Sequence, residues 1–154
     1  MRPLQDTARL AIACLDLTSL NDGDDEAAIV RLAERAAAAP DRVAALCVWP
    51  RFVPVALAHA PAGVAVAAVA NFPDGGLDVE RALRDTEAIV AAGAQEVDVV
   101  MPWRALATGD AAACAALLRA VRRACEGRVL KVILETSLLK TDALIAQAAR
   151  IALA

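Results

Sequence analysis

The sequence predicts an α/β protein that forms part of a TIM (β/α)8 barrel, with about the first five β/α units present. Five short apolar runs alternate with alanine-rich amphipathic stretches. The runs are nearly continuous in Val, Ile and Leu, as is typical of parallel strands covered on both faces. They begin about 30 residues apart, close to the roughly 31 residues per unit of a barrel of about 250 residues. No Gly-rich phosphate loop follows the first run, which favours a barrel over an open doubly wound sheet.

The predicted elements follow one another along the chain without a linker or a change in composition. The predicted strands are residues 12–17, 44–49, 64–70, 96–101 and 130–135. The predicted helices are residues 24–39, 50–60, 77–92, 111–126 and 141–152. Acidic residues in the loops supply helix N-caps, and Gly93 stands where a helix end favours a left-handed residue. We therefore expect one domain over residues 1–154.

Composition and charge exclude several classes of protein. The chain is 59% hydrophobic, with a mean hydropathy of +0.51, a net charge of −3 and a pI near 5.1. This charge provides no basic surface for nucleic acid or an anionic membrane, and every apolar run is shorter than a membrane span. The four cysteines lack CxxC spacing and a preceding signal peptide, so we expect a reducing, cytoplasmic location. His59 is the only histidine, so we expect no multi-histidine metal site and no cofactor.

The most informative polar residues lie within the fourth and fifth apolar runs. Asp98 interrupts the run Glu-Val-Asp-Val-Val-Met, where an unpaired carboxylate would be costly to bury. Lys131, one of only two lysines, lies on the next predicted strand. Because adjacent strands are about 5 Å apart, the two side chains can meet. The pair is either a structural ion pair that fixes strand order or part of a catalytic site.

Three further candidates lie on the first two predicted strands. Asp16 and Thr18 end the first, and Cys47 lies in the second. In a barrel, the C-terminal ends of the strands and the loops after them build the active site. The alternatives are that Asp16 is a turn or cap residue and that Cys47 is a packed core thiol.

Several segments of the chain, taken in order, resemble the deoxyribose-phosphate aldolase family. The similarity runs from about residue 8 to the end and rests on LDLTSLN (15–21), CVWPRFVP (47–54), ANFPDG (70–75), GAQEVDVV (93–100), PWRAL (102–106) and LKVILET (130–136). The resemblance implies a class I aldolase without metal. Such an enzyme reversibly cleaves 2-deoxy-D-ribose 5-phosphate to D-glyceraldehyde 3-phosphate and acetaldehyde through a lysine Schiff base.

The resemblance also implies roles for individual residues. Asp98 matches the proton-relay aspartate, and Lys131 matches the fifth-strand lysine of the same polar network. Asp16, Thr18 and Cys47 match positions that line the substrate pocket. The implied partners are small phosphorylated sugars and aldehydes, with no nucleic acid and no membrane.

The family's Schiff-base lysine, on a sixth strand, is not matched within residues 1–154, nor are its phosphate-binding loops. We therefore expect this chain to be inactive alone. One alternative is a non-catalytic half-barrel that associates with another chain, including a second copy, through the open strand edges. Another is that Lys131 serves as a substitute amine.

Overall fold

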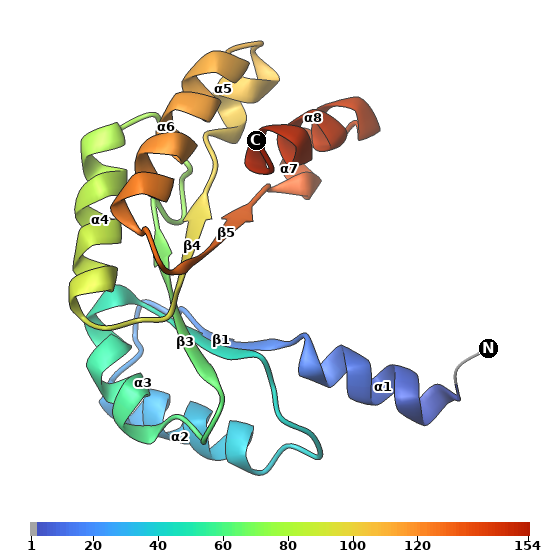
Figure 1. The fold of residues 1–154 in the computed structure, drawn as a ribbon, viewed down its shortest axis with the longest axis vertical. Coiled ribbons are helices and arrows are strands. Elements are labelled where there is room, and N and C mark those ends of the chain that lie inside the picture. The colour runs from blue at the N-terminus through green and yellow to red at the C-terminus, as the bar shows by residue number, and fades with distance from the viewer. Residues whose placement is uncertain (1–2) are drawn as a thin grey trace. The chain divides into compact units, whose positions relative to one another are not determined.

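The computed structural model describes residues 3–154, and Figure 1 shows strands alternating with helices along that part of the chain. The strands are parallel and follow one another in the sheet in the order β1-β2-β3-β4-β5. They are β1 Asp16–Ser19, β2 Ala45–Val48, β3 Ala65–Ala70, β4 Glu96–Val100 and β5 Val129–Ile133. This arrangement confirms the predicted α/β class with five barrel-type units.

Helices precede the first strand, connect successive strands from β1 to β5 and follow the last strand. They are α1 Leu4–Ala13, α2 Glu26–Ala37, α3 Val53–His59, α4 Val79–Ala91, α5 Trp103–Ala107, α6 Ala111–Ala124, α7 Thr136–Leu139 and α8 Asp142–Ala152, with a 3₁₀ turn η1 at Pro50–Phe52. Among residues 3–154, none of these helices has the length and apolar character needed to cross a membrane.

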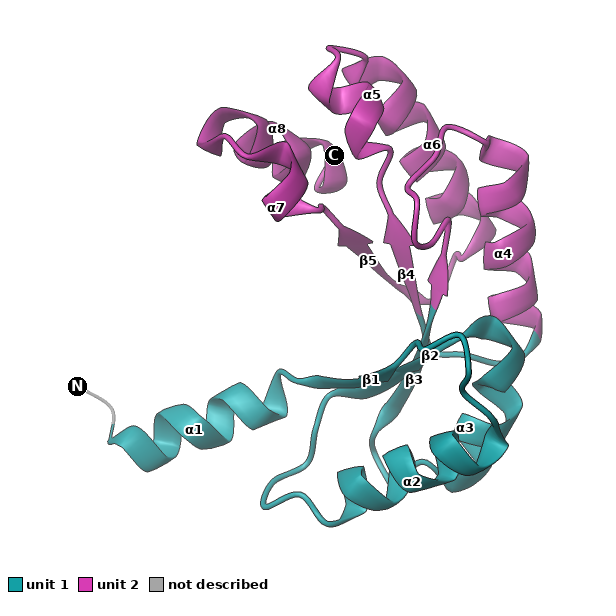
Figure 2. Ribbon diagram, turned by 180° about the vertical axis from the view of Figure 1, so that it is seen from behind, with its two compact units in different colours: residues 1–68, 92–96 teal, residues 69–91, 97–154 magenta. Residues whose placement is uncertain are grey.

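The chain divides into two compact units, which Figure 2 colours separately. Unit 1 comprises residues 1–68 and 92–96, and unit 2 comprises residues 69–91 and 97–154. One boundary falls between Ala68 and Val69, inside β3, and another between Glu96 and Val97, inside β4, so both strands contribute residues to both units. The prediction of one domain over residues 1–154 stays a prediction.

Unit 1 contains the first two β/α units and the beginning of the third strand. In α2, Ile29, Leu32, Ala33 and Ala36 are buried, at the spacing that gives a helix one apolar face. The helix begins at its N-cap Asp25, whose side chain accepts a hydrogen bond of 2.8 Å from the Ala28 N–H.

Unit 2 contains the remaining strands and the helices that follow them. In α6, Cys114, Leu117, Leu118 and Val121 form the buried face, and Asp110 caps the helix by accepting a 3.0 Å hydrogen bond from the Ala113 N–H. The packing partners of α6 include α4, α5 and α8. Residues of β4 are almost fully buried, as expected for a strand covered on both faces.

The first predicted strand is wrong in position. Ile12 and Ala13 are the last residues of α1, and β1 begins only at Asp16. Asp16 therefore begins this strand rather than ending it, and Thr18 is its third residue. The predicted strand therefore overlaps β1 only at Asp16 and Leu17, whereas each of the other four predicted strands covers most of an observed strand. The helices α1, α5 and α7 were not predicted.

Candidate functional site

The predicted pair of Asp98 and Lys131 is formed within unit 2. Lys131 Nζ lies 3.1 Å from Asp98 Oδ1, joining adjacent strands β4 and β5. Asp98 is flanked in sequence by fully buried Val97 and Val99, whose side chains point to the opposite face of the strand. The Asp98 side chain is only 10% exposed and that of Lys131 is 35% exposed, so water screens this attraction less than it screens a surface pair.

The neighbours of Lys131 show which face of β5 carries the pair. Leu130 and Val132 line a pocket together with residues of α6 and α8. Because side chains alternate along a strand, Lys131 points away from these helices. Asp98 lies on the same side, since its carboxylate meets the Lys131 ammonium. In a closed barrel, the face opposite the helix layer is the interior.

The other three candidates are brought together in unit 1. Thr18 and Cys47 are register partners on β1 and β2, and Asp16 lies two residues before Thr18. These side chains therefore share one face of the two strands. The Thr18 hydroxyl donates to the Asp16 carbonyl at 3.2 Å, and Cys47 is buried. Their assignment to a substrate pocket stays a prediction.

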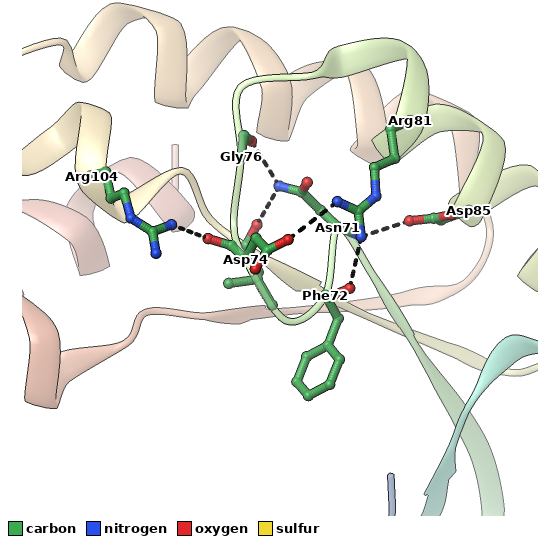
Figure 3. Close-up of polar contacts among 8 residues, drawn as sticks. Asn71, Phe72, Asp74, Gly76, Arg81, Asp85 and Arg104 are labelled. Atoms are coloured by element: carbon green, nitrogen blue, oxygen red, sulfur yellow. Dashed lines mark hydrogen bonds and ion pairs between the residues drawn. The ribbon is translucent and has the colours of Figure 1, made fainter. Parts of the chain in front are cut away.

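A cluster centred on Asn71, absent from the predicted site residues, follows β3 in unit 2 (Figure 3). The Asn71 side-chain amide donates to the Gly76 and Val100 carbonyls, each at 2.9 Å. The Asn71 N–H donates to Asp85 Oδ2 of α4 at 3.0 Å. In the sequence, Asn71 entered only as part of the ANFPDG segment (70–75), one of those on which the family resemblance rests.

Two arginines hold the rest of the loop that follows Asn71. Arg81 donates to the Phe72 carbonyl at 2.9 Å and lies 3.5 Å from Asp74 Oδ2. Arg104, stacked over the Trp103 ring, donates to the Asp74 carbonyl at 2.7 Å. Figure 3 shows these groups converging on the loop. We call Asn71, Asp74, Gly76, Arg81, Asp85 and Arg104 the Asn71 cluster.

A second polar network, also absent from the predicted site residues, closes the loop after β1 in unit 1. Asp24 Oδ2 accepts from the Ser19 hydroxyl at 2.8 Å, and Asp24 Oδ1 accepts from the Asn21 side-chain amide at 3.0 Å. These hydrogen bonds hold the pKa of Asp24 below its ordinary value of 3.8, and the bond from Asn21 has the largest effect. The nearby Arg51 guanidinium lowers the pKa further. Trp49 donates to the Asn21 carbonyl at 3.3 Å and so attaches the loop to the end of β2.

The donor set offers little to a metal ion. Among residues 3–154, no group of three or more His, Cys, Asp or Glu side chains is arranged to hold one. The chemistry of the described polar groups is that of ion pairs and hydrogen bonds between strand ends and loops.

The chain is similar to known aldolases over nearly all of its length. It is 44% identical over 155 residues to the deoxyribose-phosphate aldolase of Agrobacterium fabrum, covering 97% of this chain and 59% of that protein. Two solved structures described as putative deoxyribose-phosphate aldolases share its fold. That from Coccidioides immitis has a TM-score of 0.82 at 28% identity, covering 94% of this chain and 56% of that one. That from Toxoplasma gondii has a TM-score of 0.86 at 25% identity, covering 97% and 57%.

A family model supports the same relationship. The model of the DeoC/LacD family aldolases matches residues 10–154, which include every strand and all the candidate site residues. The matched relatives are longer, and this chain spans less than two thirds of their length. On the match over residues 10–154, the chain belongs to the DeoC/LacD family of aldolases.

Proposed function

We propose that this chain supplies the proton-handling part of an aldolase site that cleaves 2-deoxy-D-ribose 5-phosphate to D-glyceraldehyde 3-phosphate and acetaldehyde. The observation that carries the proposal is the 3.1 Å contact between Asp98 and Lys131 on adjacent strands. The 44% identity to the Agrobacterium fabrum deoxyribose-phosphate aldolase supports this substrate.

The proposed chemistry is that of a Schiff base. A lysine amine condenses with the aldehyde carbon of the open-chain sugar and releases water. The resulting iminium accepts the electron pair of the C2–C3 bond as that bond breaks and the C3 hydroxyl loses its proton. In this scheme, as the family resemblance implies, the amine is the lysine on the sixth strand of the family's barrel.

Asp98 is proposed as the proton relay for this step. Its carboxylate is almost buried and is positioned by the Lys131 ammonium, so it has a fixed direction and little competition from water. Lys131 is proposed as the partner that holds the carboxylate. Because its Nζ contacts the Asp98 carboxylate, Lys131 is not proposed as the nucleophile. Asp16, Thr18 and Cys47 are proposed to line the pocket for the sugar.

A chimera tests the proposal. Residues 1–154 would be joined to the part of the Agrobacterium fabrum protein that lies C-terminal to the matched region, and cleavage of 2-deoxyribose 5-phosphate would be followed by a coupled assay for glyceraldehyde 3-phosphate. We expect the chimera to cleave the sugar. We also expect Asp98→Asn to lower kcat by about 10²–10⁴-fold, the usual contribution of a positioned acid or base.

Borohydride trapping with acetaldehyde, read by peptide mass spectrometry, identifies the amine in the chimera. An adduct on the added segment supports the proposed roles, whereas an adduct on Lys131 would assign the nucleophile to that residue. A folded chimera that neither cleaves the sugar nor traps acetaldehyde would contradict the proposed function.

A second candidate function is association of this chain with another chain. It is favoured by apolar exposure in unit 2, where Val129 on β5 is 51% exposed and Leu153 is 88% exposed. One related structure, that of the Aeropyrum pernix deoxyribose phosphate aldolase, is described as tetrameric. Light scattering over a dilution series tests this candidate, and a monomer at every concentration would count against it.

A further inference from the structure

The side chain of Asn71 joins the C-terminal ends of β3 and β4. Asn71 is fully buried, and its two amide N–H groups are donated to the carbonyls of Gly76 and Val100. The backbone N–H of Asn71 donates to the Asp85 carboxylate of α4. Strand β3 ends at Ala70. Directly after it, the Asn71 side chain supplies the hydrogen bond to the Val100 carbonyl of β4.

The chemistry of this position requires a donor. Both groups that face the Asn71 amide nitrogen are carbonyl oxygens, so only an NH₂ group satisfies them. In contrast, Asn71 Oδ1 is buried and has no hydrogen-bond partner within residues 3–154. The polar contacts of the Asn71 side chain are therefore made through its NH₂ group. Its φ of 54° is left-handed, a conformation that asparagine tolerates better than most residues.

The bond to Val100 acts close to Asp98. Val100 lies two residues after Asp98, so both side chains lie on the same side of β4. On the other edge, the Met101 N–H donates to the Ile133 carbonyl of the β5 strand at 3.1 Å. The end of β4 is thus held from both edges, and Asp98 meets Lys131 just before it.

The loop after Asn71 also approaches the end of β4 closely at Gly75. A Cβ added to Gly75 would lie 2.5 Å from the Met101 carbonyl oxygen and 2.8 Å from Val100 Cγ1. The absence of a side chain at Gly75 therefore lets the loop lie close to the end of β4. Arg81 and Arg104 fix the same loop through the Phe72 and Asp74 carbonyls.

We infer that Asn71 is a positioning residue, whose donated hydrogen bond to the Val100 carbonyl sets β4 so that Asp98 meets Lys131. The value of that pairing for catalysis rests on the function proposed above, but the geometric claim does not depend on aldol cleavage.

The presence of only two lysines gives a direct measurement of the pair. Brief acetylation of the native chain with an N-hydroxysuccinimide ester, followed by peptide mass spectrometry, yields the ratio of modification at Lys131 to that at Lys140. Only the neutral amine reacts, so a lysine held as an ammonium by a carboxylate reacts slowly. Lys140 is exposed and forms no ion pair with the described residues, so it serves as the internal reference.

Three variants and one control define the expected result. Asp98→Asn removes the carboxylate and should raise the Lys131 to Lys140 ratio several-fold. Asn71→Asp keeps the shape but replaces the donor with an acceptor, and Asn71→Gly keeps the left-handed backbone without a side chain. Both should raise the ratio toward the Asp98→Asn value. The matched control, Asn21→Asp, makes the same chemical change in the loop after β1 and should leave the ratio unchanged.

Two outcomes would overturn the inference. One is an unchanged ratio in a folded Asn71→Asp or Asn71→Gly chain, with folding checked by circular dichroism. The other is a ratio that Asp98→Asn itself fails to raise, since no pair would then exist to be positioned. A ratio that rises as expected while the chimera is inactive would contradict the proposed function and leave the positioning role of Asn71 supported.

Discussion

At the scale of single residues, the buried side chains of Asp98 and Asn71 are stabilised in different ways. Asp98 is stabilised by charge, because the Lys131 ammonium lies 3.1 Å from its carboxylate. Asn71 is stabilised by donation alone, because its amide nitrogen meets two carbonyls. Removing Lys131 takes the ammonium away from a buried charge, whereas removing Asn71 takes a donor away from two carbonyls, and a buried charge is the more costly group to disturb.

Lys131→Met tests the cost of leaving the Asp98 carboxylate without its ammonium partner. We expect a loss of about 2 kcal/mol in the free energy of unfolding, because the Lys131 side chain is 35% exposed and fully buried pairs lose roughly 3–5 kcal/mol. Urea unfolding followed by circular dichroism measures the loss. Lys140→Met, at an exposed site, should change stability by less than about 0.5 kcal/mol. Equal effects of the two substitutions would show that the pair contributes nothing.

The carboxyl of Asp24 predicts an acid-dependent stability. Because the folded-state pKa lies below 3.8, its hydrogen bonds stabilise the fold above that pH, and the contribution disappears as pH falls through the folded pKa. Asn21→Ala removes the side-chain hydrogen bond that lowers the Asp24 pKa most, so this pKa should rise toward 3.8. Carboxyl-carbon NMR titration measures the pKa directly. The urea midpoints of wild type and variant should differ near neutral pH and converge in acid. A difference that persists in acid would assign the effect to something other than this carboxyl.

The sequence predicted the contact between Asp98 and Lys131 but not the Asn71 cluster. An aspartate inside an apolar strand has a high desolvation cost, so its need for a partner is visible without coordinates. Lys131 was the natural partner because it lies on the next strand, and the structure brings the two together. Asn71 carries no such signal, because an asparagine at a strand end is ordinary. Its importance depends on the carbonyl of Val100, which is 29 residues away in the chain.

At the scale of elements, the loop between β3 and α4 depends on one glycine. Gly75 has a φ of +60° and approaches the Met101 carbonyl, whereas Gly76 has open space around its Cα. Gly75→Ala should therefore destabilise the chain by about 2–4 kcal/mol through backbone strain and overpacking. Thermal unfolding of Gly75→Ala and Gly76→Ala, compared side by side, measures this. A similar fall in the unfolding temperature of both variants would show that the close approach of Gly75 to β4 does not determine the loss of stability.

The error in the first strand has a physical cause. The segment Ile12-Ala13-Cys14-Leu15 is continuously apolar, and such a run does not by itself distinguish a strand from a helix. The helix α1 buries none of its residues against the described chain, so its apolar positions lack the packing that marks the other helices. Strands β2 to β5 were located correctly because Val, Ile, Leu and Ala fill short runs bounded by turn residues.

At the scale of the whole molecule, the cysteines can report whether the two units unfold together. Burial raises the pKa of the Cys114 and Cys125 thiols above 9.0, and Cys47 is also buried, whereas Cys14 is exposed. A thiol-specific reagent should therefore modify Cys14 first. Cys47 belongs to unit 1, and Cys114 and Cys125 belong to unit 2.

Labelling these buried thiols across a urea series tests the prediction of a single domain. We expect Cys47, Cys114 and Cys125 to become reactive with the same midpoint, because β3 contributes residues to both units and cannot be lost from one alone. Quantification by peptide mass spectrometry separates the three sites. Reaction of Cys47 at clearly lower urea than Cys114 would show that the units unfold separately.

The position of the unit boundary inside β3 has a practical consequence for split-protein reporters built from this chain. A cut between Ala68 and Val69 would divide a buried strand, leave exposed edges that invite aggregation, and separate residues 92–96 from the rest of unit 1. Gly109, in the exposed turn between α5 and α6, has a φ of +96° and open space around it. A cut at that turn would leave every strand whole, so it is the better site at which to divide the gene into two reassembling halves.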